Sequence, residues 1–294
     1  MNYHIGLDIG GTKIAAGLIL NKKIIKKARV NTNAKAKKTQ IINNIFNAID
    51  LVFDSKATGI GIGIAGQIDQ KNGILISSPN FSNNFKNVKI EKIINQKFKK
   101  PVKIENDANC FALGEAICGA GKGYNPIAGL TLGTGVGGGI IINKKIYHGK
   151  FGFAGEIGHM IIEKNGFVCS CGKNGHLEAY TSGTAMTKIY QKITGQNKNS
   201  LFVEEKFKQG EKNAVKTFKI MSEALACGIS NIINILDPEI IVLGGGLSKV
   251  KSLIMPAIKL AKEQSISKKP NKTKIAISIL KDDAAVLGAA LLFN

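Results

Sequence analysis

A carboxylate followed by a glycine turn opens the chain, with Asp8 shortly before Gly10-Gly11-Thr12-Lys13. Two adjacent glycines let the backbone approach a phosphate closely, and the N–H groups of such a turn form an anion-binding concavity. Thr12 adds a hydroxyl donor, Lys13 adds a positive charge, and Asp8 is suited to hold Mg²⁺ through water. The pattern is neither a Walker A loop nor GxGxxG, because we expect no helix directly after it. An ordinary glycine hairpin would use the same residues.

Two further glycine-rich turns follow apolar runs. LGTGVGGG contains Thr134 and Gly135, and LGGG contains Gly245 and Gly246. Folds of the α/β class place ligands at the ends of strands. One such turn means little, but three of them, each ending a predicted strand, indicate a nucleotide cleft.

Asp107 lies in ENDAN, between a short apolar strand and the predicted start of a helix. Phosphoryl transfer needs positioning, charge neutralisation and a group that accepts the hydroxyl proton. A carboxylate near a helix N-terminus is well oriented for that last task. The alternative is a helix cap made of Asn and Asp residues.

Four potential metal ligands, His159, Cys169, Cys171 and His176, lie within eighteen residues. Two thiolates and two imidazoles suit a closed tetrahedral Zn²⁺ site. The group uses two of the four histidines and two of the five cysteines. Its spacing is not that of a standard zinc finger, and the alternative is a reduced, unligated cysteine pair.

Such a metal would be structural, because no ligand position is left open for chemistry. It would fix the loop that carries Glu156 and Glu178. These two carboxylates could then accept hydrogen bonds from sugar hydroxyls.

Strand and helix patterns alternate around these motifs, which predicts an α/β fold. The predicted strands are residues 3–9, 14–20, 23–30, 58–65, 102–105, 239–243 and 273–279, and one strand on each side of the glycine-rich turn within 129–142. The predicted helices are residues 37–53, 88–98, a helix from near Asp107, and 182–194, 201–208, 211–236, 250–263 and 284–293.

An internal repeat links the two halves of the chain. GLDIGGTKIAAGLI at 6–19 aligns without a gap with GLTLGTGVGGGIII at 129–142. The period is too long for a solenoid and therefore predicts a duplicated domain. We expect a small N-terminal lobe at 1–118, a large C-terminal lobe with the metal loop at 119–280, and a closing helix at 281–294 that packs back on the first lobe.

The length and composition predict two domains or one large α/β unit, with a substantial buried interior and a basic surface. The 294 residues are 44% hydrophobic, with 34 glycines and a formal charge of +21. Basic surfaces bind nucleic acids by releasing counterions. However, Arg29 is the only arginine, and arginine is the residue favoured for bidentate contacts with guanine and phosphate. We therefore expect a lysine-rich solvated surface and no nucleic-acid partner.

Five cysteines with one CxC pair do not form a secreted disulfide framework. The N-terminus runs straight into a predicted strand, without a basic region followed by an apolar stretch. We also expect no segment with the ~20 apolar residues needed to span a bilayer. These features predict a cytoplasmic protein without a membrane partner.

Taken together, the motifs resemble the ROK family of sugar kinases and repressors, within the actin-like ATPase superfamily. The ordered set covers nearly the whole chain: DIGGTK, GIAGQID, SSPN, ENDAN, LGTGVGGG, AGEIGH, CSCGKNGHLE and LGGG. The resemblance implies a duplicated actin-like (ribonuclease H-like) α/β fold of two lobes with a cleft between them.

By this resemblance, Asp107 is the catalytic base, which takes the proton of a sugar 6-hydroxyl as that oxygen attacks the γ-phosphate of ATP. The residues implied to line the sugar pocket are Asn80, Asn106, Asp107, Glu156, His159 and Glu178. The residues implied to surround Mg-ATP are Asp8, Gly10, Gly11, Thr12, Lys13, Thr134, Gly135, Gly245 and Gly246.

The AGEIGH and LEAYTSGTA segments are most similar to the glucokinases of the family. The implied activity is an ATP-dependent glucokinase, active as a homodimer or higher homo-oligomer. N-acetylglucosamine, N-acetylmannosamine, fructose and allose stay open as substrates, and polyphosphate as the phosphoryl donor.

His176 departs from the family pattern, which has a third cysteine at this place. Histidine is a competent zinc ligand, but its imidazole reaches further from the backbone than a thiolate does. We therefore expect the metal loop, and with it Glu178, to sit differently.

The alternative from another class is a sugar-responsive transcriptional regulator of the same family. Such regulators carry a helix-turn-helix domain ahead of the kinase-like part. Here the first phosphate motif begins at Asp8, which leaves no room for that domain, so we expect the enzyme.

Overall fold

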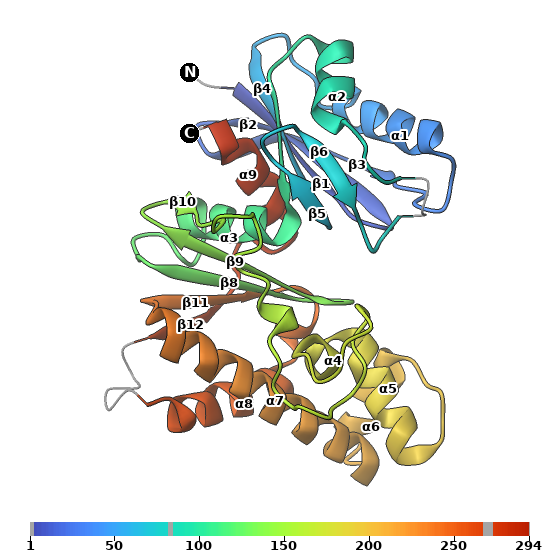
Figure 1. Cartoon of the computed structure of the whole chain (residues 1–294), viewed down its shortest axis with the longest axis vertical. Coiled ribbons are helices and arrows are strands. Elements are labelled where there is room, and N and C mark those ends of the chain that lie inside the picture. Colours follow the sequence, from blue (N-terminus) through green and yellow to red (C-terminus); the bar gives the residue numbers. More distant parts are fainter. Residues whose placement is uncertain (1–2, 82–84, 267–272, 294) are drawn as a thin grey trace. The chain divides into compact units, whose positions relative to one another are not determined.

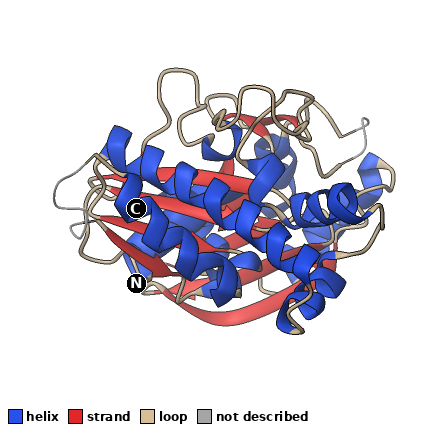
Figure 2. Ribbon diagram, turned by 90° about the horizontal axis from the view of Figure 1, so that it is seen from below, coloured by secondary structure: helices blue, strands red, loops and turns tan. Residues whose placement is uncertain are grey.

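The computed structural model describes residues 3–81, 85–266 and 273–293. Helices and strands, blue and red in Figure 2, alternate along the chain as an α/β fold requires. The chain forms two compact units. The first comprises Met1–Gly123, Gly139–Ala154 and Ile279–Asn294, and the second comprises Tyr124–Gly138 and Gly155–Ser278.

The first unit is built on a mixed five-stranded sheet with the order β3-β2-β1-β4-β7 (Figure 1). Its strands are β1 (Tyr3–Ile9), β2 (Lys13–Leu20), β3 (Lys23–Asn31), β4 (Ala57–Ile64) and β7 (Val102–Asn106). Its helices are α1 (Lys38–Asp50), α2 (Ile90–Phe98), α3 (Asp107–Cys118) and α9 (Ala284–Ala290). A hairpin of β5 (Gln67–Asp69) and β6 (Ile74–Ser77) follows β4 and was not predicted.

Strand alternation decides which face of this sheet each helix covers. In β1, Ile5 and Leu7 point into the core that α1 and α2 close, whereas Gly6 and Asp8 point to the other face. On that other face α9 lies directly on the strand backbone. A Cβ added at Gly61 of β4 would lie 1.8 Å from the carbonyl oxygen of Ala289. Glycine at this position therefore lets the last helix close the first unit.

The second sheet repeats the topology of the first, with the order β10-β9-β8-β11-β12. Its strands are β8 (Ile127–Leu132), β9 (Val136–Ile142), β10 (Lys145–Ile146), β11 (Ile240–Gly244) and β12 (Lys274–Ile277). The helices of the second unit are α4 (Glu178–Thr181), α5 (Gly183–Thr194), α6 (Ser200–Lys208), α7 (Lys212–Leu236) and α8 (Lys251–Gln264). The matching strand order confirms the duplication that the repeat predicted.

Several expected boundaries differ from the structure. The strand predicted at 273–279 is only Lys274–Ile277, and the closing helix ends at Ala290 and continues as a 3₁₀ helix, Leu291–Phe293. Residues 139–154 belong to the first unit, although the sequence placed them in the large lobe. The cause is the close packing of Gly139 on α3, where an added Cβ would lie 2.8 Å from the Cβ of Ala112.

The expectation that no segment is long and apolar enough to span a bilayer was wrong. Helix α7 meets that criterion by length and composition. In the structure its apolar side chains, among them Phe218, Leu225 and Ile229, are buried in the core of the second unit. A core helix passes the same test as a membrane span, and this packing accounts for the composition of α7.

Candidate functional site

Three parallel strands bring the predicted phosphate turn and Asp107 to one edge of the first sheet. Ile9 at the end of β1 pairs with Ile64 of β4, which pairs with Asn106 of β7. The turn that starts at Gly10 and the start of α3 at Asp107 therefore lie at the same edge of the sheet, with the end of β4 between them. Ligands of α/β sheets bind at this carboxyl edge.

The turn after β1 is tied down from both sides. The Gly10 N–H donates to the Lys13 carbonyl at 3.0 Å, and the Thr32 hydroxyl donates to the Gly10 carbonyl at 2.6 Å. A Cβ added at Gly11 would lie 3.2 Å from the Cβ of Asn80. Asn80 therefore packs against the turn, as expected of two elements of one binding site.

Lys13 has an ion-pair partner that the sequence did not reveal. Its ammonium lies 3.3 Å from the Asp282 carboxylate, which also lies 3.2 Å from the guanidinium of Arg29. All three side chains are exposed, and exposed ion pairs contribute little to stability. A phosphate at the turn could therefore replace Asp282 as the partner of the Lys13 ammonium with little loss of free energy.

Asp8 lies in an acidic environment at the end of β1. Burial raises the pKa of its carboxyl to about 7, the charge of Asp107 adds to the rise, and Lys13 opposes it. A bound divalent cation would favour the ionised form and reverse this shift. Asp8 would therefore be ionised whenever a divalent cation is bound beside it.

Asn106, and not Asp107, caps α3. The Asn106 side chain accepts hydrogen bonds from the N–H groups of Ala108 and Asn109 at 2.9 and 3.3 Å, and its amide donates to the Gly66 carbonyl at 3.4 Å. Asp107 is the first residue of the helix, and its Oδ1 accepts from the Ala108 N–H at 3.0 Å. The cap thus fixes the backbone from which the Asp107 carboxylate projects.

In the second unit, the turn between β8 and β9 is held by the start of α5. The Gly133 N–H donates to the Gly135 carbonyl at 2.9 Å, and its own carbonyl accepts from the Gly183 N–H at 2.8 Å. The Thr184 hydroxyl donates to the Thr134 carbonyl at 3.0 Å. Thr134 and Gly135 are therefore part of a rigid turn.

Gly245 follows β11, the parallel neighbour of β8, and reaches the same edge of the second sheet. It adopts a φ of +82°, and an added Cβ would lie 2.4 Å from the Leu132 carbonyl oxygen. The turn at Gly245 and Gly246 therefore packs beside the end of β8, which leads into the Thr134 turn. Each sheet thus carries glycine turns at the end where its parallel strands finish.

Glu178 connects the metal loop to the β8–β9 turn. Its Oε1 accepts from the Ser170 hydroxyl at 2.5 Å and from the Cys169 thiol at 3.3 Å, and its Oε2 accepts from the Val136 N–H at 3.0 Å. Burial alone would raise the pKa of Glu178, but the hydrogen bonds from Ser170, Val136 and Cys169 outweigh it and lower that pKa. Glu178 is therefore an ionised group that anchors the loop.

The four predicted metal ligands converge in the second unit, with all donor atoms within 4.8 Å of one another. His159 Nδ1 lies 3.1 Å from His176 Nδ1 and 3.8 Å from Cys169 Sγ, and Cys171 Sγ lies 3.3 Å from His176 Nδ1. Zinc bonds of about 2.0–2.3 Å imply tetrahedron edges of roughly 3.3–3.8 Å. The cluster fits a structural zinc ion. The other nitrogen of His159 lies 3.9 Å from Glu156 Oε2, which is close but longer than a hydrogen bond.

Comparison with known proteins decides the family. The ROK family profile matches residues 4–294. The chain belongs to the ROK family. The predicted resemblance, and with it the actin-like α/β fold, is confirmed.

Two ROK kinases and one solved structure illustrate the similarity. The chain is 34% identical to the glucokinase of Thermotoga maritima, over 97% of this chain and 95% of that protein. It is 33% identical to the N-acetyl-D-glucosamine kinase of Histophilus somni, over 99% and 98% of the two chains. The structure of a ROK family glucokinase from Streptomyces griseus, in complex with glucose and AMPPNP, superposes with a TM-score of 0.84 and 30% identity, over 99% of both chains.

This ROK protein divides its candidate residues between the two units. The first unit holds Asp8, Gly10, Gly11, Thr12, Lys13, Asn80, Asn106 and Asp107. The second holds Thr134, Gly135, Glu156, His159, Cys169, Cys171, His176, Glu178, Gly245 and Gly246. Within each unit the structure brings neighbouring members together, as the distances above show.

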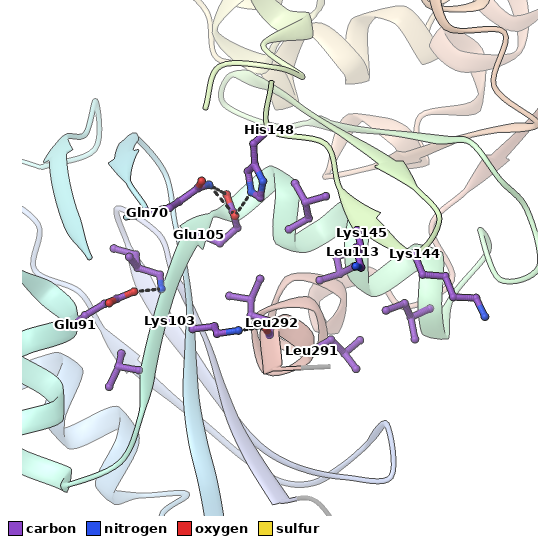
Figure 3. Close-up of a pocket in the computed structure, with 14 residues that line it drawn as sticks. Gln70, Glu91, Lys103, Glu105, Leu113, Lys144, Lys145, His148, Leu291 and Leu292 are labelled. Atoms are coloured by element: carbon purple, nitrogen blue, oxygen red, sulfur yellow. Dashed lines mark hydrogen bonds and ion pairs between the residues drawn. The ribbon is translucent and has the colours of Figure 1, made fainter. Parts of the chain in front are cut away.

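A cavity of about 640 Å³ in the first unit was missed by sequence reasoning (Figure 3). Apolar side chains of β7, α3 and the C-terminal segment, such as Ile104, Leu113 and Leu291, form its walls. Glu105 and His148 meet at its polar end. His148 is an isolated histidine outside every motif, and Glu105 stood in ENDAN without an assigned role.

Proposed function

We propose that this ROK protein is an ATP-dependent hexose kinase that phosphorylates the 6-hydroxyl of glucose. The observation that carries the proposal is that Asp107, at the start of α3, lies at the same sheet edge as the end of β1, which holds Asp8 and leads into the glycine turn. The similarity to glucokinases, one of them solved with glucose and AMPPNP, supports the choice of sugar and of donor.

In this proposal Asp107 accepts the proton of the sugar hydroxyl as the oxygen–phosphorus bond forms and the bond to the leaving ADP breaks. Asn106 fixes the backbone of Asp107 through the helix cap. The sugar would be held by Asn80, Asn106, Glu156, His159 and Glu178. The cap and the buried strand end hold Asp107 in one orientation, which a base in phosphoryl transfer needs.

The phosphates would lie against the turns that contain Gly11 and Thr134, with Lys13 supplying a positive charge. Bound Mg²⁺ would neutralise phosphate charge, and in this proposal Asp8 would hold the ion through water. The structural zinc would keep Glu156 and Glu178 in place through His159 and Cys169.

An N-acetylhexosamine is the second candidate substrate, because N-acetyl-D-glucosamine kinases match this chain almost as well as the glucokinases do. Fructose, N-acetylmannosamine and allose rank behind it. Cytoplasmic location and homodimeric assembly stay predictions.

The test is a coupled assay with ATP and Mg²⁺ across these hexoses, comparing wild type with Asp107→Asn and an exposed control, Asp69→Asn. We expect kcat of Asp107→Asn to fall about 10²–10⁴-fold, the usual contribution of a general base, while the fold and sugar binding persist. Asp69→Asn should keep wild-type turnover. Turnover of Asp107→Asn within tenfold of wild type would refute the role of the base. A larger kcat/KM for N-acetylglucosamine than for glucose would move the assignment to the second candidate.

A further inference from the structure

Glu105, two residues before Asp107, has a buried carboxylate. It stands at the end of β7, is 3% exposed, and its Oε1 accepts from the backbone N–H of Asn106 at 2.8 Å and from the Asn109 amide at 3.0 Å. The Gln70 amide donates to both carboxylate oxygens, at 3.0 and 2.9 Å. A buried carboxylate requires such donors because it has lost its hydration.

These bonds fix a backbone N–H before Asp107, that of Asn106, and a side-chain amide after it, that of Asn109. Asn106 precedes Asp107 and caps α3, and Asn109 lies in the first helical turn after it. The Asn109 Oδ1 is buried without a hydrogen-bond partner among the described residues. The amide therefore keeps its donor end on Glu105 although its acceptor end goes unsatisfied, which shows that the Glu105 bond dominates the orientation.

His148 completes the set from a different segment. Its Nε2 lies 2.6 Å from Glu105 Oε2, and because a carboxylate only accepts, this nitrogen carries the proton. The His148 carbonyl accepts from the Ala154 N–H at 3.1 Å, which closes the loop after β10 and holds the imidazole toward β7. Figure 3 shows Gln70, Glu105 and His148 converging at the end of the cavity.

We propose that Glu105 and His148 form a positioning pair that orients Asp107 for proton transfer. This inference rests on the proposed kinase function. Glu105 hydrogen-bonds Asn106 and Asn109, which lie before and after Asp107 in the chain. His148 holds the Glu105 carboxylate through a charge-assisted hydrogen bond, which is shorter and stronger than a neutral one. Neither residue is assigned contact with a substrate, so the pair acts on the chemical step and not on binding.

The test compares His148→Ala, His148→Gln and the control Lys145→Ala. Lys145 lines the same cavity and is exposed, without a contact to Glu105 among the hydrogen bonds of the described residues. Glutamine places an amide N–H near the position of the histidine Nε2. Measured are kcat, the KM values for hexose and Mg-ATP, and the melting temperature.

We expect His148→Ala to lower kcat about 10- to 100-fold with both KM values within twofold, because a small misplacement of a reacting group costs up to ~10²-fold. His148→Gln should recover kcat to within about threefold of wild type, and Lys145→Ala should match wild type. A role in folding alone would lower the melting temperature without this split between kcat and KM.

Three outcomes would overturn the inference: unchanged kcat in His148→Ala, failure of His148→Gln to recover kcat, or a rise in KM as large as the fall in kcat. If His148→Ala does not fold, Gln70→Leu is used instead, because it removes another donor to Glu105. This variant must then show a lower kcat with both KM values unchanged. Failure of the proposed function is distinct, because wild type itself would then phosphorylate no hexose.

Discussion

Asp8 should make the stability of this protein fall as the pH rises from acid toward neutrality. The pKa of its carboxyl is 3.8 in the unfolded chain and about 7 in the fold, where burial and the charge of Asp107 oppose ionisation. Between these values the folded state binds more protons than the unfolded state, so the free energy of unfolding decreases with rising pH. Above pH 7 the decrease is complete.

The magnitude follows from the pH window. Between the two pKa values of Asp8, the free energy of unfolding falls by about 1.4 kcal/mol per pH unit. The 1.5 units from about pH 5.5 to 7 therefore lower it by about 2 kcal/mol. Asp8→Asn removes this proton equilibrium. The free energy of unfolding of wild type, relative to that of Asp8→Asn, should therefore decrease by about 2 kcal/mol between pH 5.5 and 8.

The assay is urea unfolding of both proteins, followed by circular dichroism at pH 5.5, 7 and 8. The titrating groups that do not interact with Asp8 are shared by both proteins and cancel in the difference. Asp69→Asn is the matched control, because hydrogen bonds from the Asn72 side chain and backbone lower the pKa of that exposed carboxyl, away from the window. A difference between wild type and Asp8→Asn that stays constant with pH, or grows in the opposite direction, would refute the burial argument. Added Mg²⁺ should reduce the difference at pH 8 if the ion binds ionised Asp8.

Two further predictions concern the second unit. Gly245→Ala should lower the free energy of unfolding by about 1–3 kcal/mol, because its φ is +82° and the new Cβ would meet the Leu132 carbonyl. Gly246→Ala should change it by no more than about 0.5 kcal/mol, because the new Cβ meets open space among the described residues. Equal urea midpoints for the two variants would contradict this prediction. The purified protein should contain about one zinc ion per chain, measured by atomic absorption. Cys171→Ser should lower the zinc affinity at least about tenfold, whereas Cys227→Ser should leave it unchanged. Equal zinc content in both variants would exclude the cluster as the binding site.

Local patterns made much of the fold predictable. The strand at Tyr3–Ile9 and the helix at Lys38–Asp50 follow from apolar period, and the gapless repeat anticipated that the second sheet would copy the first. The metal ligands were found because they are rare residue types close together in sequence. Asn106 and Asp107 were placed at a helix start because their residue types favour it.

Contacts between segments that are distant in sequence leave no local pattern from which they could be predicted. The His148–Glu105 bond joins residues 43 positions apart, and the pair of Lys13 with Asp282 spans 269 positions. The two bonds of Glu178 to Ser170 and Val136 depend on how the metal loop folds back on the β8–β9 turn. Such pairings arise from tertiary packing, so the roles of these residues became visible only in the structure.

The C-terminal helix has a consequence for biosynthesis. Helix α9 covers the glycine-lined face of β1 and β4, strands that leave the ribosome more than two hundred residues earlier. Until α9 emerges, the backbone around Gly6 and Gly61 stays uncovered, whereas the long stretch Gly155–Ser278 has already been made. Domains generally fold as units during synthesis. We therefore expect the half of the protein that is translated first to mature last, and truncation before residue 284 to leave nascent chains that need chaperones.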